Sequence, residues 1–77
     1  MSELELAVLR TARVFGPCSN ADIARRINYP ADKCYRIVKS LELEGLLIHP
    51  KLQRWDISEL GRDVFRRMPK QIALFNA

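Results

Sequence analysis

Basic side chains gathered in the middle of the chain are the residues best suited to chemistry. Lys33, Arg36 and Lys39 recur at intervals of three, which places them on one face of a helix. Arginine can form two hydrogen bonds to the edge of guanine, and lysine pairs readily with phosphate. The residues that we predict to contact a polyanion together with these three are Arg25, Arg26, Tyr35, Ser40, Lys51 and Arg54.

Residues able to catalyse a reaction or hold a metal are sparse. The chain has two cysteines, Cys18 and Cys34, and a single histidine, His49, in a spacing that fits no zinc pattern. A glycine-rich phosphate loop is missing, and no third group is available to orient a cysteine–histidine pair. The sequence therefore predicts no catalytic residue, no metal, no cofactor and no evident small-molecule effector, so the protein is not expected to be an enzyme.

The cysteines and the histidine have plainer expected roles. We expect Cys34 to be a small core side chain and His49 to be an exposed strand residue. Cys18 precedes a predicted helix. If its thiol is exposed there, the helix N-terminus would favour the thiolate form.

Composition predicts one small globular domain. The chain has 77 residues, of which 48% are hydrophobic and 29% are charged, and its net charge is +4. A modest basic excess suits nucleic acid without establishing it, because many small proteins are equally basic. The acidic residues near the N-terminus argue against a signal peptide. No apolar run approaches the roughly 20 residues that a membrane span needs, so none is predicted. We expect a cytoplasmic protein with free thiols, which would be nucleoid-associated if it binds DNA.

Helical periodicity appears twice before residue 28. Residues 3–15 form the first predicted helix, which Gly16 and Pro17 end. Ser19 is placed to cap a second helix over residues 20–27, with Asp22 completing a shortened capping box. The expected buried positions are Leu4, Val8, Ala12 and Phe15 in the first helix, and Ala21, Ile23, Ala24 and Ile27 in the second.

A third helix follows a tight turn at residues 28–30. Asn28 tolerates a left-handed conformation, and Pro30 suits the start of a helix. The predicted helix covers residues 31–44 and is followed by Gly45 as its C-terminal cap. Its expected buried stripe is Cys34, Ile37, Val38 and Leu41.

The remainder of the chain predicts a hairpin and a last helix. Residues 46–48 and 54–57 read as strands around a turn at residues 50–53, with Trp55 facing the core. Ser58 caps a helix that runs to about residue 68, with Leu60, Val64, Phe65 and Met68 expected on its buried side. We place the domain at residues 1–68, followed by an apolar tail at 69–77. The tail packs either on the domain or, as we narrowly favour, on a second copy.

This order is typical of one fold class: mainly helical, with a small β-hairpin. Two short helices joined by a tight turn form a helix-turn-helix, and a hairpin directly after them is a wing. In this arrangement the helix at residues 31–44 would lie in the major groove of DNA. Lys51 and Arg54 would lie on the wing, close to the backbone or the minor groove.

Three segments resemble the N-terminal domain of IclR-type transcriptional regulators and, more loosely, MarR-type ones. They are residues 20–27 (NADIARRI), 34–47 (CYRIVKSLELEGLL) and 54–62 (RWDISELGR). The resemblance implies a winged helix-turn-helix that regulates transcription, usually as a dimer on a palindromic site, with Lys33, Tyr35 and Arg36 as reading positions. This sequence departs from the pattern at Asp32, where the family usually has Ser or Thr.

Two classes of function remain open. The first is sequence-specific binding of double-stranded DNA for transcriptional regulation, with a possible homodimer through the first helix and the tail. The alternative is a winged-helix protein-interaction module, an accessory or anti-repressor-like adaptor that does not read DNA. RNA is a weaker option, because no aromatic platform for stacking bases is evident. The basic face, like Arg62, Arg66 and Arg67 in the last helix, could also be only a solvated surface.

Overall fold

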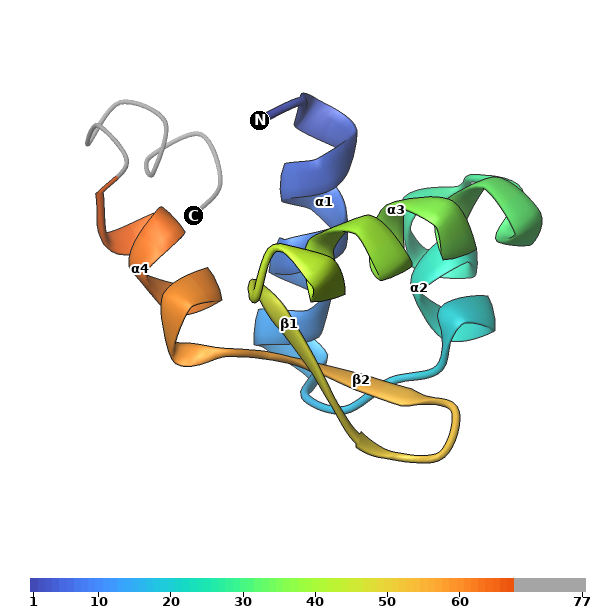
Figure 1. The fold of residues 1–77 in the computed structure, drawn as a ribbon. Coiled ribbons are helices and arrows are strands. Elements are labelled where there is room, and N and C mark those ends of the chain that lie inside the picture. Colours follow the sequence, from blue (N-terminus) through green and yellow to red (C-terminus); the bar gives the residue numbers. More distant parts are fainter. Residues whose placement is uncertain (68–77) are drawn as a thin grey trace.

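A computed structural model describes residues 1–67 and shows four helices and one β-hairpin (Figure 1). The elements in chain order are α1 (Glu3–Phe15), α2 (Asn20–Ile27), α3 (Ala31–Leu43), β1 (Leu47–Lys51), β2 (Arg54–Ile57) and α4 (Glu59–Arg66). This confirms the predicted fold class and the predicted order. None of these helices combines the length and the apolar character needed to cross a membrane.

Serine residues are the N-caps of three of the helices. Ser2 and Glu5 form a reciprocal capping box at α1, and the Glu5 pKa is lowered because its carboxylate accepts the Ser2 backbone N–H. Ser19 and Ser58 each accept one backbone N–H at the starts of α2 and α4, as predicted. Each cap satisfies a donor that the first helical turn would otherwise leave unpaired.

Left-handed residues end α2 and follow α3. Asn28 has φ 57° and ψ 55° after α2, which confirms the predicted turn. At the end of α3, Gly45 has φ 81°, its N–H bonds to Glu42 O, and Leu46 N–H bonds to Leu41 O. These two hydrogen bonds make a Schellman motif, in which glycine is favoured because the position requires a positive φ.

The hairpin contains a β-bulge, and its turn is shorter than predicted. Leu47 opposes Ile57 and Ile48 opposes Asp56, but the register shifts before Lys51 opposes Arg54. The prediction of a turn over residues 50–53 was therefore wrong at its start, since β1 continues to Lys51. Proline has no N–H for the ladder, and the bulge lets Pro50 lie within a strand.

A short segment before α2 extends the sheet. Cys18 N–H donates to Trp55 O at 2.9 Å, and Trp55 N–H donates to Cys18 O at 2.8 Å. β2 is therefore flanked by β1 on one side and by the Cys18 backbone on the other. These hydrogen bonds join the α1–α2 loop to the hairpin.

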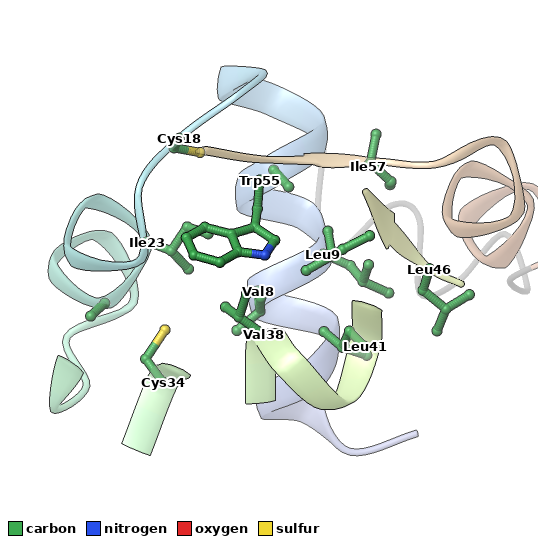
Figure 2. Close-up of a cluster of buried hydrophobic side chains, with 13 residues drawn as sticks. Val8, Leu9, Cys18, Ile23, Cys34, Val38, Leu41, Leu46, Trp55 and Ile57 are labelled. Carbon is green, nitrogen blue, oxygen red and sulfur yellow. The ribbon is translucent and has the colours of Figure 1, made fainter. Parts of the chain in front are cut away.

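One hydrophobic core draws on every element of the fold except α4, which packs on its border. Figure 2 shows the Trp55 indole in the middle of this cluster, among side chains from α1, α2 and α3. Trp55 is only 4% exposed, which confirms its predicted core role. The buried members are Val8, Leu9, Ala12, Cys18, Ile23, Ala24, Cys34, Val38, Leu41, Leu46, Leu47, Trp55 and Ile57.

The structure corrects several predicted core positions. Phe15 and Leu60 are about half exposed, at 52% and 50%, and Ala21 is also exposed. Ala21 lies more than 100° around α2 from the centre of the stripe that Ile23, Ala24 and Ile27 define. Conversely, Leu9 is fully buried although the predicted stripe omitted it, because α1 packs against α2, α3 and β2 at once.

The end of α4 differs from its predicted position. The helix ends at Arg66, with Arg67 as its cap residue, whereas the sequence predicted an end near residue 68. Met68, Pro69 and the predicted apolar tail lie outside the described residues.

Candidate nucleic-acid interface

The α2–turn–α3 unit is held by hydrogen bonds from both helices. Tyr29 N–H donates to Ala24 O at 2.9 Å, which closes the turn after α2. The Asn20 side chain, at the start of α2, donates to Ala31 O at 2.8 Å. These contacts fix the first residue of α3 against α2, which is the bracing that a helix-turn-helix requires.

α3 has one buried side and one exposed basic side. Cys34, Val38 and Leu41 are fully buried, and this confirms most of the predicted stripe. The predicted contact residues of α3 that face solvent are Lys33, Tyr35, Arg36 and Ser40. Within residues 1–67, Lys33 and Arg36 form no ion pair, so their charges are available to a ligand.

Lys39 differs from its two basic neighbours because it is tied to the hairpin through Glu42. Its ammonium group lies 3.2 Å from Glu42 Oε1, and the same oxygen accepts the Trp55 indole N–H at 3.2 Å. The indole hydrogen bond is the main reason that the Glu42 pKa is lowered. Lys39 is only partly exposed, so a ligand would meet it as a member of this network.

Aromatic side chains join the exposed face of α3 to the hairpin. Tyr35 contacts Trp55 edge to face, with ring centroids 6.1 Å apart and planes at 82°. His49 stacks on Trp55 at 4.4 Å with an angle of 7°, and its Nε2 accepts Gln53 N–H. Tyr35 thus packs against the hairpin while 45% of it remains exposed, so packing and ligand contact are both open to it.

Asp22 links α2 to the hairpin. Its carboxylate forms an ion pair with Arg25 and lies 3.8 Å from the Arg54 guanidinium. The predicted shortened capping box is therefore only half formed. Ser19 accepts Asp22 N–H, but the Asp22 side chain accepts a hydrogen bond from Arg25 instead of the N-cap backbone. The remaining basic residue of α2, Arg26, is exposed and lies over the Phe15 ring at 3.7 Å from its centroid.

The hairpin end carries the last predicted contact residues. Lys51 is exposed beside the two-residue turn, and Arg54 follows that turn on β2. Leu52, between them, is 85% exposed. The predicted contact residues thus lie on α2, α3 and the hairpin. Asp22 links α2 to the hairpin, and Glu42 links α3 to the hairpin.

Both thiols are buried, which corrects the expectation for Cys18. Cys18 is 5% exposed, and its pKa is raised chiefly because burial disfavours the thiolate. Burial raises the pKa of Cys34 to about 11. Residues 1–67 contain no group of three side chains able to hold a metal ion.

Sequence reasoning missed three residues that shape the interface. Asn20 was seen only as part of a helix, and Glu42 and Asp22 were not recognised as links to the hairpin. Their partners Ala31, Trp55 and Arg54 lie 11, 13 and 32 positions away in sequence. No local pattern indicates contacts over such separations.

Comparison with known proteins gives one match. The model of the winged helix-turn-helix DNA-binding family matches residues 1–48, which include α1, α2, the tight turn and α3. Neither the search of curated proteins nor the search of solved structures gave a match. The matched region is more than half of the chain and contains the braced helix pair described above. The chain therefore belongs to the winged helix-turn-helix DNA-binding family.

Proposed function

We propose that this protein binds double-stranded DNA in a sequence-specific manner and thereby regulates transcription. The observation that carries the proposal is the outward face of α3, where Lys33 and Arg36 are exposed and without ion pairs within residues 1–67. The opposite face of the same helix is fixed in the core. A rigid helix with available cationic donors is suited to the major groove.

Different side chains would have different roles on the duplex. Arg36, near the middle of α3, would hydrogen-bond to guanine, whereas Lys33 and Lys39 would contact phosphates. Tyr35 would meet a sugar or a thymine methyl group, and Ser40 would meet the backbone. Arg25 and Arg26 of α2 and Lys51 and Arg54 of the hairpin would add phosphate contacts on either side of α3.

The proposed function also includes a dimer and excludes catalysis. A palindromic site read by two copies would give this small domain the contact area that specific binding needs. α1 exposes Val14 and Phe15, which could contribute to contact between copies. Membership of a DNA-binding family favours a non-enzymatic regulator over an enzyme, and its place of action would be the nucleoid.

Replacement of Arg36 tests the proposal. After selection of bound duplexes from a random pool, Arg36→Ala should weaken binding to the recovered site by about 1–3 kcal/mol and relax discrimination at one base pair. Gel shift or fluorescence anisotropy on the site and on single-base variants measures both effects. Arg62→Ala, which removes an exposed arginine from α4, is the matched control and should bind as the wild type does.

A second candidate is an adaptor that binds protein and does not read DNA. Two observations favour it: Asp32 places a carboxylate in the first turn of α3, and Leu43 is 88% exposed at the end of that helix. An adaptor would select no sequence from the random pool, and Arg36→Ala would leave any weak duplex binding unchanged. Either result would count against a DNA reader.

A further inference from the structure

A hollow lies between α1 and α4, away from the proposed DNA-binding face. It is an open depression with a volume of about 240 Å³, lined by Arg13, Arg62, Phe65 and Arg66. Figure 1 shows α4 at the opposite end of the molecule from α2 and the N-terminal half of α3. The proposed DNA-binding function uses none of these lining residues.

The hollow combines guanidinium groups from two helices with an aromatic ring. The Arg13 guanidinium lies over the Phe65 ring, 4.2 Å from its centroid. Arg66 is neutralised by acids of its own helix, at 2.7 Å from Asp63 and 3.9 Å from Glu59. Within residues 1–67, neither Arg13 nor Arg62 forms an ion pair, so two arginines lining the hollow keep uncompensated charge.

We propose that this hollow binds an acidic segment of a protein partner, independently of DNA. An arginine pairs with a carboxylate through two parallel hydrogen bonds, and Arg13 and Arg62 could each offer that geometry. Phe65 provides an apolar contact for the aliphatic part of the same segment. Arginine and aromatic residues, phenylalanine included, are both enriched in the buried cores of protein interfaces.

The arrangement of charge favours an acidic peptide over a second DNA duplex. Glu59 and Asp63 lie on α4 among its arginines, with 84% and 38% of their side chains exposed. Duplex DNA carries a phosphate charge about every 1.7 Å, so a continuous backbone would come close to these carboxylates. A peptide can place single carboxylates at the two available arginines and leave the acids of α4 in solvent.

The same charges argue against a second copy of the chain. In a two-fold symmetric contact, the same patch of both copies is buried, with residue i on residue j and j on i. Two patches that each carry Arg13 and Arg62 without ion pairs within residues 1–67 would then face one another, which brings like net charge together. A partner of opposite charge is therefore the better fit.

Titration with a defined peptide tests the inference on the full chain. The probe is a fluorescent ten-residue peptide of glutamate, leucine and glycine, and its control has glutamine in place of every glutamate. We expect wild-type protein to bind the glutamate peptide at least tenfold more tightly than the glutamine peptide. Amide NMR shifts should move around Arg13, Arg62 and Phe65 and stay unchanged around Arg36.

Neutral polar substitutions separate the two surfaces. Arg62→Gln, and the double variant with Arg13→Gln, should weaken peptide binding at least tenfold while DNA binding stays within twofold. Arg36→Gln should have the opposite pattern. The single Arg62→Gln variant guards against misfolding, because Arg62 is exposed and the Arg13–Phe65 contact stays intact in it.

Several outcomes would overturn the inference. One is that the protein binds the glutamate and glutamine peptides equally well. Another is that Arg62→Gln binds the glutamate peptide as tightly as the wild type does. A third is that inorganic phosphate displaces the peptide completely while chloride at equal ionic strength does not. Loss of DNA binding in Arg62→Gln would also overturn it, by assigning the hollow to the duplex. A failure of DNA binding in every variant would count against the proposed function alone, because the peptide experiment needs no duplex.

Discussion

A single tryptophan connects the interface to the core. Trp55 donates its indole N–H to Glu42 of α3, exchanges two backbone hydrogen bonds with Cys18, and is covered by His49 on β1. Tyr35 contacts its edge. Because one buried ring contacts α3 and both strands, the outward face of α3 has a fixed orientation relative to the hairpin.

Gly61 marks a close approach of α4 to the rest of the fold. A Cβ atom at this position would lie 2.3 Å from Leu46 O and 2.7 Å from Ile57 Cγ1. Gly61→Ala should therefore lower the free energy of unfolding by about 1–3 kcal/mol through overpacking, measured by urea denaturation. Gly16→Ala is a useful comparison, because nothing lies within 4 Å of its Cβ position and only its φ of +72° opposes the change. If Gly61→Ala had the same free energy of unfolding as the wild type, α4 would be able to move away from Leu46 at no cost in stability.

Cys34 should make the fold sensitive to alkaline pH. The pKa of its buried thiol is raised from 9.0 to about 11, so the unfolded chain loses this proton at lower pH than the folded protein does. A raised folded-state pKa gives a stabilising contribution that is complete below about pH 9 and declines between pH 9 and 11. Urea denaturation across this range should show a steeper loss of stability in wild type than in Cys34→Ala. Parallel pH profiles of the two proteins would contradict the shift.

At the scale of elements, Asp22 joins α2 to the hairpin, and it also holds two arginines that are candidate DNA contacts. Asp22 pairs with Arg25 and Arg54, which we propose as phosphate contacts. A phosphate backbone must compete with this carboxylate for both guanidinium groups. The free protein therefore holds part of its proposed binding surface in an intramolecular ion-pair network.

Release of this network should strengthen DNA binding. Asp22→Asn removes the competing charge, so affinity for duplex DNA should rise and the salt slope should steepen by about 1, the value of one extra phosphate contact. Anisotropy at several salt concentrations measures both quantities. Asp63→Asn is the matched control, because Asp63 pairs with Arg66 at the same spacing on α4 and lies outside the proposed DNA surface. Unchanged or weaker binding by Asp22→Asn would show that Arg25 and Arg54 do not contact phosphates.

At the scale of the whole molecule, basic groups lie at both ends of the fold. α3 and the hairpin carry the proposed DNA contacts, and the hollow between α1 and α4 carries Arg13 and Arg62. α4 lies at the opposite end of the molecule from α2 and the N-terminal half of α3 (Figure 1). A net charge of +4 alone does not distinguish one basic surface from two. The separation matters because a bound duplex would leave the α1–α4 end open to a partner.

Salt dependence tests how much of the molecule contacts DNA. If about four basic side chains of α2, α3 and the hairpin meet phosphates, the slope of log K against log salt should lie near −3 to −4 for each chain bound. Anisotropy between low and physiological salt measures this slope. The double variant of Arg13 and Arg62 should retain it, and a slope near zero would favour the adaptor function instead.

Local sequence was sufficient for most of the fold. The caps at Ser19 and Ser58, the left-handed Asn28 and the buried stripe of α3 were predicted because each depends on residues within a few positions of one another. The family match to residues 1–48 agrees with this part of the prediction. The turn of the hairpin was misplaced because a bulge at Pro50 depends on the partner strand.

The predicted exposure of Cys18 was wrong for a similar reason. A residue just before a helix is commonly exposed, but the Cys18 backbone pairs with Trp55, which lies 37 positions later. The burial of such a residue cannot be predicted from its sequence neighbours, because the strand that covers it comes from another part of the chain. The same applies to Leu9, whose burial results from three elements packing on α1.

By itself, the amino-acid sequence determined where the helices begin, where α1 and α2 end, which side of α3 is apolar and which residues of α3 are basic. These features depend on periodicity and capping, which act within one or two turns of the chain. Only the tertiary structure decided that Lys33 and Arg36 are without ion pairs within residues 1–67 while Lys39, Arg25 and Arg54 have partners. It also decided that Arg13 and Arg62 line one hollow. Charge pairing and hollows depend on distances between segments far apart in sequence, and folding alone brings those segments together.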